Sequence, residues 1–348
     1  MTRAAGALAT TLVLVTAATA VLPARPQQAQ FRGGTDTVPV YVTVRDRDGA
    51  FVTNLTRDDF ELRDNGRTVP VTQFTTASQP LSIVVLIDGS GSMMDEFSRA
   101  VEGARSLVLR LLPEDRALVG SFADDVRFSP SFTSDRDLLL SYLRNGFNLR
   151  MGLETHLWDA LLQSALRLQD EPGRRAIVVL SDGYNFVTNP KTAAAATPGT
   201  NPITGKPTGA TGGLPRPPAG GSISMGNLPD GDPRRNGVPA GSARGAAVAR
   251  DVIVYAVSMW VQTESRSERP SRDLERMAID TGGSFTQLRL QDEVSPAFTD
   301  IMRELRQQYV LGFTPAAWDG KEHRLEVRLR PGGLTARARR TYLASRER

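Results

Sequence analysis

The fold of this chain is decided by the stretch Leu81-Ser82-Ile83-Val84-Val85-Leu86-Ile87-Asp88-Gly89-Ser90-Gly91-Ser92. Its first seven residues form a nearly continuous apolar run that is rich in β-branched side chains. Such a run is typical of a strand buried on both faces of a parallel sheet. Two similar runs follow at residues 176–180 and 252–257, and we interpret them as further central strands.

Helical patterns alternate with these strands along the middle of the chain. We expect helices over residues 96–112, 135–143, 157–168, 272–279 and 294–307, and shorter strands over residues 116–122, 126–128 and 284–286. This alternation predicts an α/β fold with a doubly wound, mostly parallel sheet over residues 81–309. In the last helix, apolar residues recur at helical spacing and should face the sheet; they are Phe298, Ile301, Met302 and Leu305.

Strand patterns also occupy both ends of the chain, outside the α/β pattern. The N-terminal strands lie within residues 38–76, and the C-terminal runs cover residues 309–313, 323–329 and 334–342. Each set is too short to be stable alone. We therefore predict one accessory β module built from residues 38–76 and 310–343.

The N-terminus has the features of an export signal. Arg3 precedes an apolar run at residues 5–18, and Ala18-Thr19-Ala20 is a small-x-small cleavage site. We expect residues 1–20 to be a cleaved Sec-type signal peptide and residues 21–37 a disordered leader, so the mature protein should be periplasmic or secreted. The run is short for a membrane anchor, the alternative, so no stable membrane span is expected after cleavage.

A low-complexity segment interrupts the α/β pattern. Residues 188–243 are rich in Pro, Gly, Ala, Thr and Asn and have almost no apolar periodicity. Such a composition buries too little apolar surface to order itself, so we predict a disordered insertion on the surface of the domain.

Composition excludes several classes of site and partner. The chain has no cysteine, which excludes disulfides, thiolate metal sites and a lipidated N-terminal cysteine. Its net charge is only +4, so the balance of acidic and basic residues does not require an acidic partner. Because the protein is expected to be exported, we predict no nucleic-acid partner. Basic residues gather near the C-terminus, where we interpret them as the solvated face of strands, with a patch for anionic envelope polymers as the alternative; they are Arg324, Arg328, Arg330, Arg337, Arg339 and Arg340.

Two of the central strands end in a carboxylate. Asp88 follows the first strand and Asp182 follows the strand at residues 176–180. In an open α/β sheet, ligands collect at the carboxyl ends of the strands. Gly89 and Gly91 allow a tight turn that lets two serine hydroxyls face one point. Carboxylate and hydroxyl oxygens suit a hard divalent cation, Mg²⁺ first, with Mn²⁺ or Ca²⁺ as alternatives.

The motif Asp88-x-Ser90-x-Ser92 resembles the metal-ion-dependent adhesion site of von Willebrand factor type A (VWFA) domains. That family also has a threonine in a loop before a helix, matched here by Thr155, and a late aspartate followed by glycine, matched by Asp182. The resemblance implies that the two serines and Thr155 ligate the cation directly, while the aspartates bind it directly or through water. It also implies that the cation takes a carboxylate from a partner protein, which is binding and not catalysis.

The flanks are similar to those of secreted bacterial VWFA-related proteins first described in Acidobacteria. The similar segments are Val40–Val44, Leu55–Phe60, Asp64–Gly66, Tyr309–Pro315 and Arg337–Tyr342. The expected function is therefore an exported, metal-dependent protein-binding module for adhesion or assembly, without enzymatic activity. Its oligomeric state is left open.

Two other functions are compatible with parts of this pattern. The first is a structural envelope protein whose metal site does not function, because turns and helix caps also use Asp-Gly, Ser and Thr. The second is a haloacid-dehalogenase-like phosphohydrolase, which needs a second aspartate two residues after the nucleophile; Ser90 stands there instead. A serine hydrolase would need a histidine base, and we interpret His156 as a surface helix residue.

Overall fold

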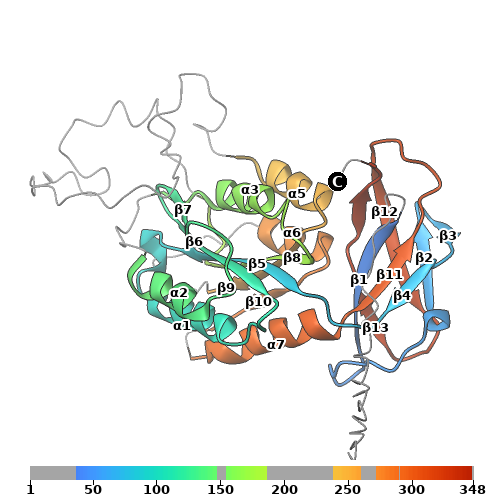
Figure 1. Ribbon diagram of the computed structural model, residues 1–348, viewed down its shortest axis with the longest axis horizontal. Coiled ribbons are helices and arrows are strands. Elements are labelled where there is room, and N and C mark those ends of the chain that lie inside the picture. The colour runs from blue at the N-terminus through green and yellow to red at the C-terminus, as the bar shows by residue number, and fades with distance from the viewer. Residues whose placement is uncertain (1–36, 147–153, 186–237, 260–271, 290, 347–348) are drawn as a thin grey trace, which may run out of the picture.

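The protein consists of a central α/β domain and a β module at its side (Figure 1). The computed structural model describes residues 37–146, 154–185, 238–259, 272–289 and 291–346. Within these ranges the prediction of an α/β fold with an accessory β module from both chain ends is confirmed.

A six-stranded sheet forms the middle of the central domain. Its strand order is β10-β9-β8-β5-β6-β7, and all neighbours are parallel except β7, which runs antiparallel to β6. The strands are β5 (Leu81–Asp88), β6 (Arg116–Phe122), β7 (Val126–Phe128), β8 (Arg174–Ser181), β9 (Ile253–Ser258) and β10 (Phe285–Gln287). Every residue of β5 is buried, as its continuous apolar run predicts.

Helices cover both faces of this sheet (Figure 1). They are α1 (Phe97–Val108), α2 (Arg136–Ser141), α3 (Leu157–Arg167), α5 (Ala240–Ala249), α6 (Asp273–Asp280) and α7 (Val294–Gln307); short η segments lie at Arg57–Asp59, Gly91–Met93 and Tyr142–Gly146. Helices α1, α2 and α7 share one apolar core with one face of β5, and α3, α5 and α6 share another core with its opposite face.

Helix α7 spans the residues that its sequence pattern predicts. Four of its apolar side chains, Phe298, Ile301, Met302 and Leu305, are buried in the same core as α1 and the central strands. Only Gln308 separates its last residue from β11, which begins at Tyr309, so the helix leads directly from the central domain into the β module (Figure 1).

The contact between α1 and α7 depends on a glycine. A Cβ added at Gly103 would overlap the Phe298 ring, 2.7 Å from its Cζ and closer still to its Cε2. We expect Gly103→Ala to lower the free energy of unfolding by about 1–3 kcal/mol, the usual cost of overpacking a core. Chemical denaturation of the variant measures this.

The matched control for this prediction is Gly245→Ala. Gly245 lies inside α5 with nothing within 4 Å of an added Cβ. There the better helix propensity of alanine should act alone and stabilise the protein by about 0.5–1 kcal/mol. Equal effects of the two substitutions would show that Gly103 is not a packing constraint.

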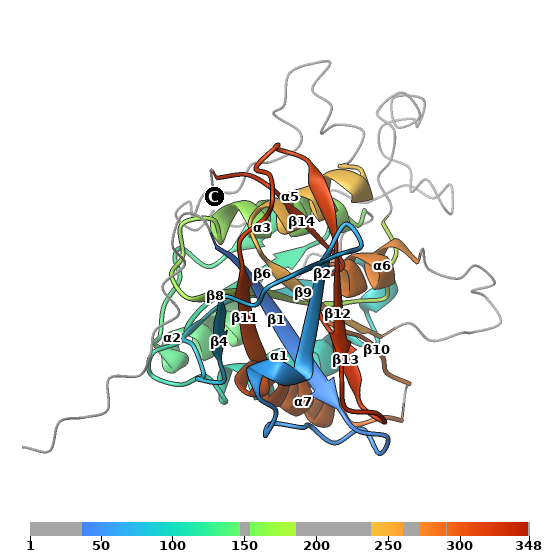
Figure 2. The same cartoon turned by 90° about the vertical axis from the view of Figure 1, so that its right-hand side faces the viewer.

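The β module contains two four-stranded sheets, each of which mixes strands from the two ends of the chain (Figure 2). Their orders are β13-β1-β11-β4 and β14-β12-β2-β3. The strands are β1 (Val38–Arg45), β2 (Phe60–Asp64), β3 (Arg67–Val69), β4 (Gln73–Thr75), β11 (Tyr309–Phe313), β12 (Glu322–Leu329), β13 (Thr335–Arg337) and β14 (Thr341–Leu343). Both sheets contribute to one apolar core, so the module is a sandwich.

The last predicted strand run, residues 334–342, differs from the structure. It divides into β13, which pairs with β1, and β14, which pairs with β12 in the other sheet. The chain leaves both ladders near Arg339, whose guanidinium binds the Asp251 carboxylate and the Pro39 carbonyl. Arg339 is only 8% exposed. The interpretation of the C-terminal arginines as a solvated face is therefore wrong for this residue.

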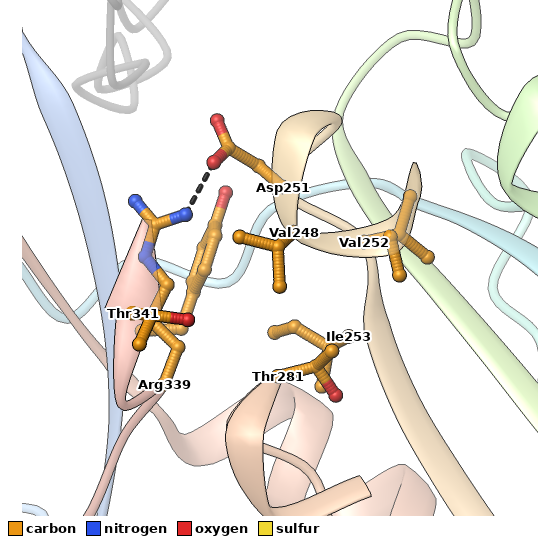
Figure 3. A pocket seen from close by; sticks show the side chains of 9 residues that line it. Val248, Asp251, Val252, Ile253, Thr281, Arg339 and Thr341 are labelled. Atoms are coloured by element: carbon orange, nitrogen blue, oxygen red, sulfur yellow. Dashed lines mark hydrogen bonds and ion pairs between the residues drawn. The ribbon is translucent and has the colours of Figure 1, made fainter. Parts of the chain in front are cut away.

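Arg339 also lines a small cavity between the two units (Figure 3). The cavity has a volume of about 10 Å³, close to the space that one water needs. Its other lining residues include Val248 and Thr281 of the central domain and Thr341 of the module. The two units therefore pack closely at this seam.

Several predicted segments lie outside the described residues. These are the signal peptide (1–20), all but the last residue of the leader (21–37) and residues 186–237, which make up most of the predicted insertion. Helix α5 begins at Ala240, inside the interval 188–243 assigned to the insertion. Its small residues look like low-complexity sequence, but Ala243 and Ala247 are buried in a core shared with α3. None of the helices in the described ranges has the length and hydrophobicity needed to span a membrane.

Candidate metal centre

Asp88 ends strand β5 and is fully buried. Its Oδ1 accepts a hydrogen bond from the Ser90 amide at 2.9 Å, and its Oδ2 accepts one from the Ser181 hydroxyl at 2.6 Å. The Gly89 amide donates to the Phe122 carbonyl of the neighbouring strand β6 at 2.8 Å. The carboxylate is thus fixed by its own turn and by β8, and the backbone that follows it is fixed to β6.

The two serines of the motif lie side by side. The Ser90 and Ser92 hydroxyl oxygens are 3.0 Å apart, although which one donates is not fixed by the geometry. Ser90 is buried and Ser92 is exposed, so this pair marks the point where the cluster reaches the surface. The turn predicted from Gly89 and Gly91 therefore brings the hydroxyls together.

Asp182 follows strand β8 and is fully buried as well. Strand β8 runs parallel to β5 with Leu180 beside Ile87, so Asp182 emerges at the same edge of the sheet as Asp88. Its Oδ1 accepts a hydrogen bond from the Tyr184 amide at 3.2 Å. Gly183 has φ +84°, which glycine adopts without strain and which turns the chain sharply after the strand.

The two carboxylates affect each other electrostatically. Burial and, next, the negative charge of Asp182 raise the pKa of Asp88 to about 7, against the hydrogen bonds from Ser181 and Ser90 that lower it. A buried carboxyl group whose pKa is raised in this way gains from a nearby cation, which favours the charged form. The electrostatics therefore suit a bound divalent ion at this edge.

Thr155 lies on a third loop, just before α3, and is buried. The loop is held to the turn after β6, because the Glu154 amide donates to Asp124 Oδ1 at 2.7 Å and the His156 amide donates to the Ala123 carbonyl at 3.3 Å. The first turn of α3, which follows this loop, is held to the Asp182 loop, since the Trp158 amide donates to Asn185 Oδ1 at 3.3 Å. The three loops that carry the predicted ligands are thus joined by hydrogen bonds.

The interpretation of His156 as a surface residue is wrong. Its side chain is 2% exposed, at the N-cap of α3, and its Nε2 lies 2.7 Å from a Glu154 carboxylate oxygen. The helical pattern that starts at Leu157 does not reveal this burial, because the cap residue lies outside the periodic part. The pairing with Glu154 makes His156 a part of the framework that holds this loop.

Some residues that support this centre are not identified from the sequence. Ser181 donates a hydrogen bond to Asp88. Its position in the sequence could have indicated this contact, because Ser181 ends the strand next to Asp88 in a parallel sheet. Asp124 and Asn185 support the Thr155 loop from turns whose sequences carry no motif. Of the two methionines beside the motif, Met93 is buried, whereas Met94 is 58% exposed.

The donor set fits a hard cation. Two carboxylates and three hydroxyls, all oxygen donors, come from loops at one edge of the sheet, and Mg²⁺, Mn²⁺ and Ca²⁺ prefer oxygen. Among the residues that the structure describes, no group of three or more His, Asp or Glu side chains is arranged to hold a metal ion. The mixed carboxylate and hydroxyl cluster is therefore the candidate metal centre in this part of the chain.

The sequence of this region is similar to that of a known family. Residues 83–185, which include Asp88, Thr155 and Asp182, match the sequence profile of the von Willebrand factor type A domain. The central domain thus contains a von Willebrand factor type A match over its first strands and helices. The sheet edge that carries the centre lies inside the matched region.

Solved structures similar to the chain include three bacterial proteins. A von Willebrand factor type A protein from Catenulispora acidiphila is 11% identical, with 82% of this chain and 73% of that chain covered and a TM-score of 0.44. An aerotolerance-related membrane protein from Bacteroides fragilis is 15% identical, with 65% and 98% covered and a TM-score of 0.41. The von Willebrand domain of the pilus tip protein Mfa5 from Porphyromonas gingivalis is 16% identical, with 65% and 95% covered and a TM-score of 0.41. No curated protein matches the chain.

Proposed function

We propose that this protein is an exported, metal-dependent protein-binding module for adhesion or assembly. In this proposal Asp88, Ser90, Ser92, Thr155 and Asp182 hold a divalent cation, Mg²⁺ in the first place. The observation that carries it is the pair of buried carboxylates on adjacent parallel strands, beside two hydroxyls that reach the surface. A cation bound there would supply a positive charge that attracts a carboxylate from a partner protein.

Binding explains this arrangement better than catalysis does. Both aspartates are buried and engaged by the loops that carry them, and Ser92, on the exposed side, bears a neutral hydroxyl. Ser90 stands where a phosphohydrolase of the haloacid-dehalogenase type would need its general acid. His156 is bound to Glu154 within the loop framework. The proposal therefore assigns the cluster to recognition of an acidic side chain.

The cation is tested by titrating the full chain with Mn²⁺ and Mg²⁺ in a calorimeter. We expect close to one ion per chain, and a loss of affinity of at least about 100-fold in Asp88→Asn, since even residues that only support metal ligands contribute 10–100-fold. Ser92→Ala should weaken binding, whereas Ser98→Ala, on an exposed turn of α1, should not change it. Absence of binding by the unsubstituted chain would contradict the assignment.

The partner's carboxylate is tested with two short peptides that differ only in one residue, Asp or Asn. The probe is the relaxation rate of water protons around Mn²⁺ bound to the protein. A carboxylate that takes a coordination position displaces water, so the Asp peptide should lower the relaxation enhancement and the Asn peptide should not. Equal responses to the two peptides would reject recognition of an acidic side chain while leaving the cation in place.

A further inference from the structure

The end of β6 and the turn that follows it contact two of the loops that carry the metal ligands. The Phe122 carbonyl accepts the Gly89 amide, and the Ala123 carbonyl accepts the His156 amide. The Asp124 carboxylate then accepts the Glu154 amide at 2.7 Å. Three successive residues therefore hold the Asp88 loop on one side and the Thr155 loop on the other.

The two bonds to the Thr155 loop enclose Thr155 itself. One reaches the residue before it and the other reaches the residue after it, so the backbone of Thr155 is fixed from both sides. The position of its buried hydroxyl relative to Ser90 thus depends on the turn that both loops share. A ligand must be held within about 0.5 Å of its productive place for a site to work.

Side-chain identity matters at only one of these three contacts. The carbonyls of Phe122 and Ala123 are supplied by any residue, whereas the bond to Glu154 needs an acceptor on the side chain of residue 124. A carboxylate that accepts a backbone N–H makes a stronger hydrogen bond than a neutral acceptor does. Asp124 is exposed, so this bond is not explained by burial of a polar group.

We propose that Asp124 is a positioning residue for the metal centre, which keeps the Thr155 hydroxyl where it can join Asp88, Ser90 and Ser92 around a cation. The inference rests on the proposed metal site. It assigns to Asp124 no contact with the cation; its effect passes through the Glu154 amide and the backbone of Thr155.

The test compares Mn²⁺ affinities of full-length variants by calorimetry. Asp124→Ala removes the acceptor and should weaken binding about 10-fold, as supporting residues of metal sites do. Asp124→Asn keeps an oxygen that can accept the Glu154 amide and should stay within about threefold of the unsubstituted protein. The matched control is Asp125→Ala, the next residue of the same turn, whose carboxylate pairs with Arg127; it should also stay within about threefold.

A double-variant cycle separates positioning from a general effect of the turn. If Asp124 acts through Thr155, Asp124→Ala should add little to Thr155→Val, which removes the hydroxyl at nearly constant volume. Thermal unfolding should shift little in the Asp124 variants because the residue is exposed. Hydrogen exchange at the Glu154 amide should accelerate in Asp124→Ala and not in Asp124→Asn.

The outcomes distinguish this inference from the proposed function. Absence of Mn²⁺ binding by the unsubstituted chain would overturn both. Binding that is unchanged in Asp124→Ala would overturn the positioning role and leave the metal site standing. An equal loss in Asp124→Asn and Asp124→Ala would show that the charge of Asp124 matters and not its hydrogen bond, which also overturns the role. Additive losses with Thr155→Val would overturn its action through Thr155.

Discussion

A chain that ends at Gln308 is expected to lose the whole β module, including the strands that remain in its N-terminal half. Strand β11 lies between β1 and β4, and β1 has β13 on its other side. Removal of residues 309–348 therefore deletes every strand that pairs with β1 or β4, and it leaves β2 with β3 alone.

The core of the module depends equally on the deleted part. Tyr309, Leu311, Phe313, Leu325 and Tyr342 are buried in it, and each such side chain contributes about 1.5–3 kcal/mol by its burial. Tyr309 also holds the segment between β1 and β2 against the module, because its hydroxyl donates to the Val52 carbonyl and accepts from the Leu55 amide. These losses exceed the stability that so small a unit can have.

The measurement is hydrogen exchange over residues 38–75, with limited proteolysis as a second probe. In the shortened chain these residues should exchange at the rate of an unfolded peptide. A chain that ends at Ser345 is the control, because it keeps β14 and the buried Ala344. Protection of residues 38–75 that survives the deletion would show that the N-terminal strands fold without their C-terminal partners.

The central sheet and the module could be predicted because their apolar patterns are local. The continuous run of β5 and the alternation of Val40, Val42 and Val44 in β1 each report burial from a few neighbouring residues. The ligands Asp88 and Asp182 could be placed at one edge because parallel strands deliver their carboxyl ends there. These features need no knowledge of contacts between distant residues.

What could not be predicted depends on contacts between residues far apart in the sequence. Arg339 is buried because Asp251 and the Pro39 carbonyl meet it, and neither lies in the same segment. The support of the Thr155 loop by Asp124 is similar, since it joins turns that are 30 residues apart. A short polar turn has no periodicity, so its sequence alone does not show which loop it contacts.

Glu304 provides the second large effect, because it is a charged side chain buried between the two units. It lies on α7 and is 2% exposed. Its carboxylate accepts hydrogen bonds from the Tyr255 hydroxyl at 2.9 Å and the Gln308 amide at 3.3 Å, and it pairs with Arg337 of β13. Burial and the charge of Glu304 raise the pKa of Tyr255, so that hydroxyl remains protonated and available as a donor.

Gln308 extends this network into the module. The amide nitrogen that binds Glu304 also donates to the Thr43 hydroxyl of β1 at 2.6 Å. Glu304 therefore joins the central sheet, through Tyr255, to strands from both ends of the chain. Its removal leaves several polar groups without their shared acceptor, which is costly inside a protein.

We expect Glu304→Ala to lower the free energy of unfolding by about 3 kcal/mol, the low end of the range for breaking a buried ion pair, since the Arg337 side chain is 32% exposed. Glu304→Gln should cost less, because its amide oxygen still accepts from Tyr255. Asp300→Ala, which breaks an exposed pair with Arg303 on the same helix, should change stability by less than about 1 kcal/mol.

Denaturant unfolding with two probes, one in the module and one in the central domain, decides what Glu304 holds together. If Glu304 couples the two units, the unsubstituted protein should unfold in a single transition reported by both probes. In Glu304→Ala the two probes should then report two transitions, with the module unfolding first. The double variant Glu304→Met with Arg337→Met should recover part of the lost stability, because it removes the Arg337 charge together with its buried partner. Recovery should be partial, since Arg45, whose nitrogen lies 3.7 Å from Glu304, also loses a partner. A loss of stability equal to that of Asp300→Ala would instead mean that the packing of α7 and the strand ladders hold the units together without this carboxylate.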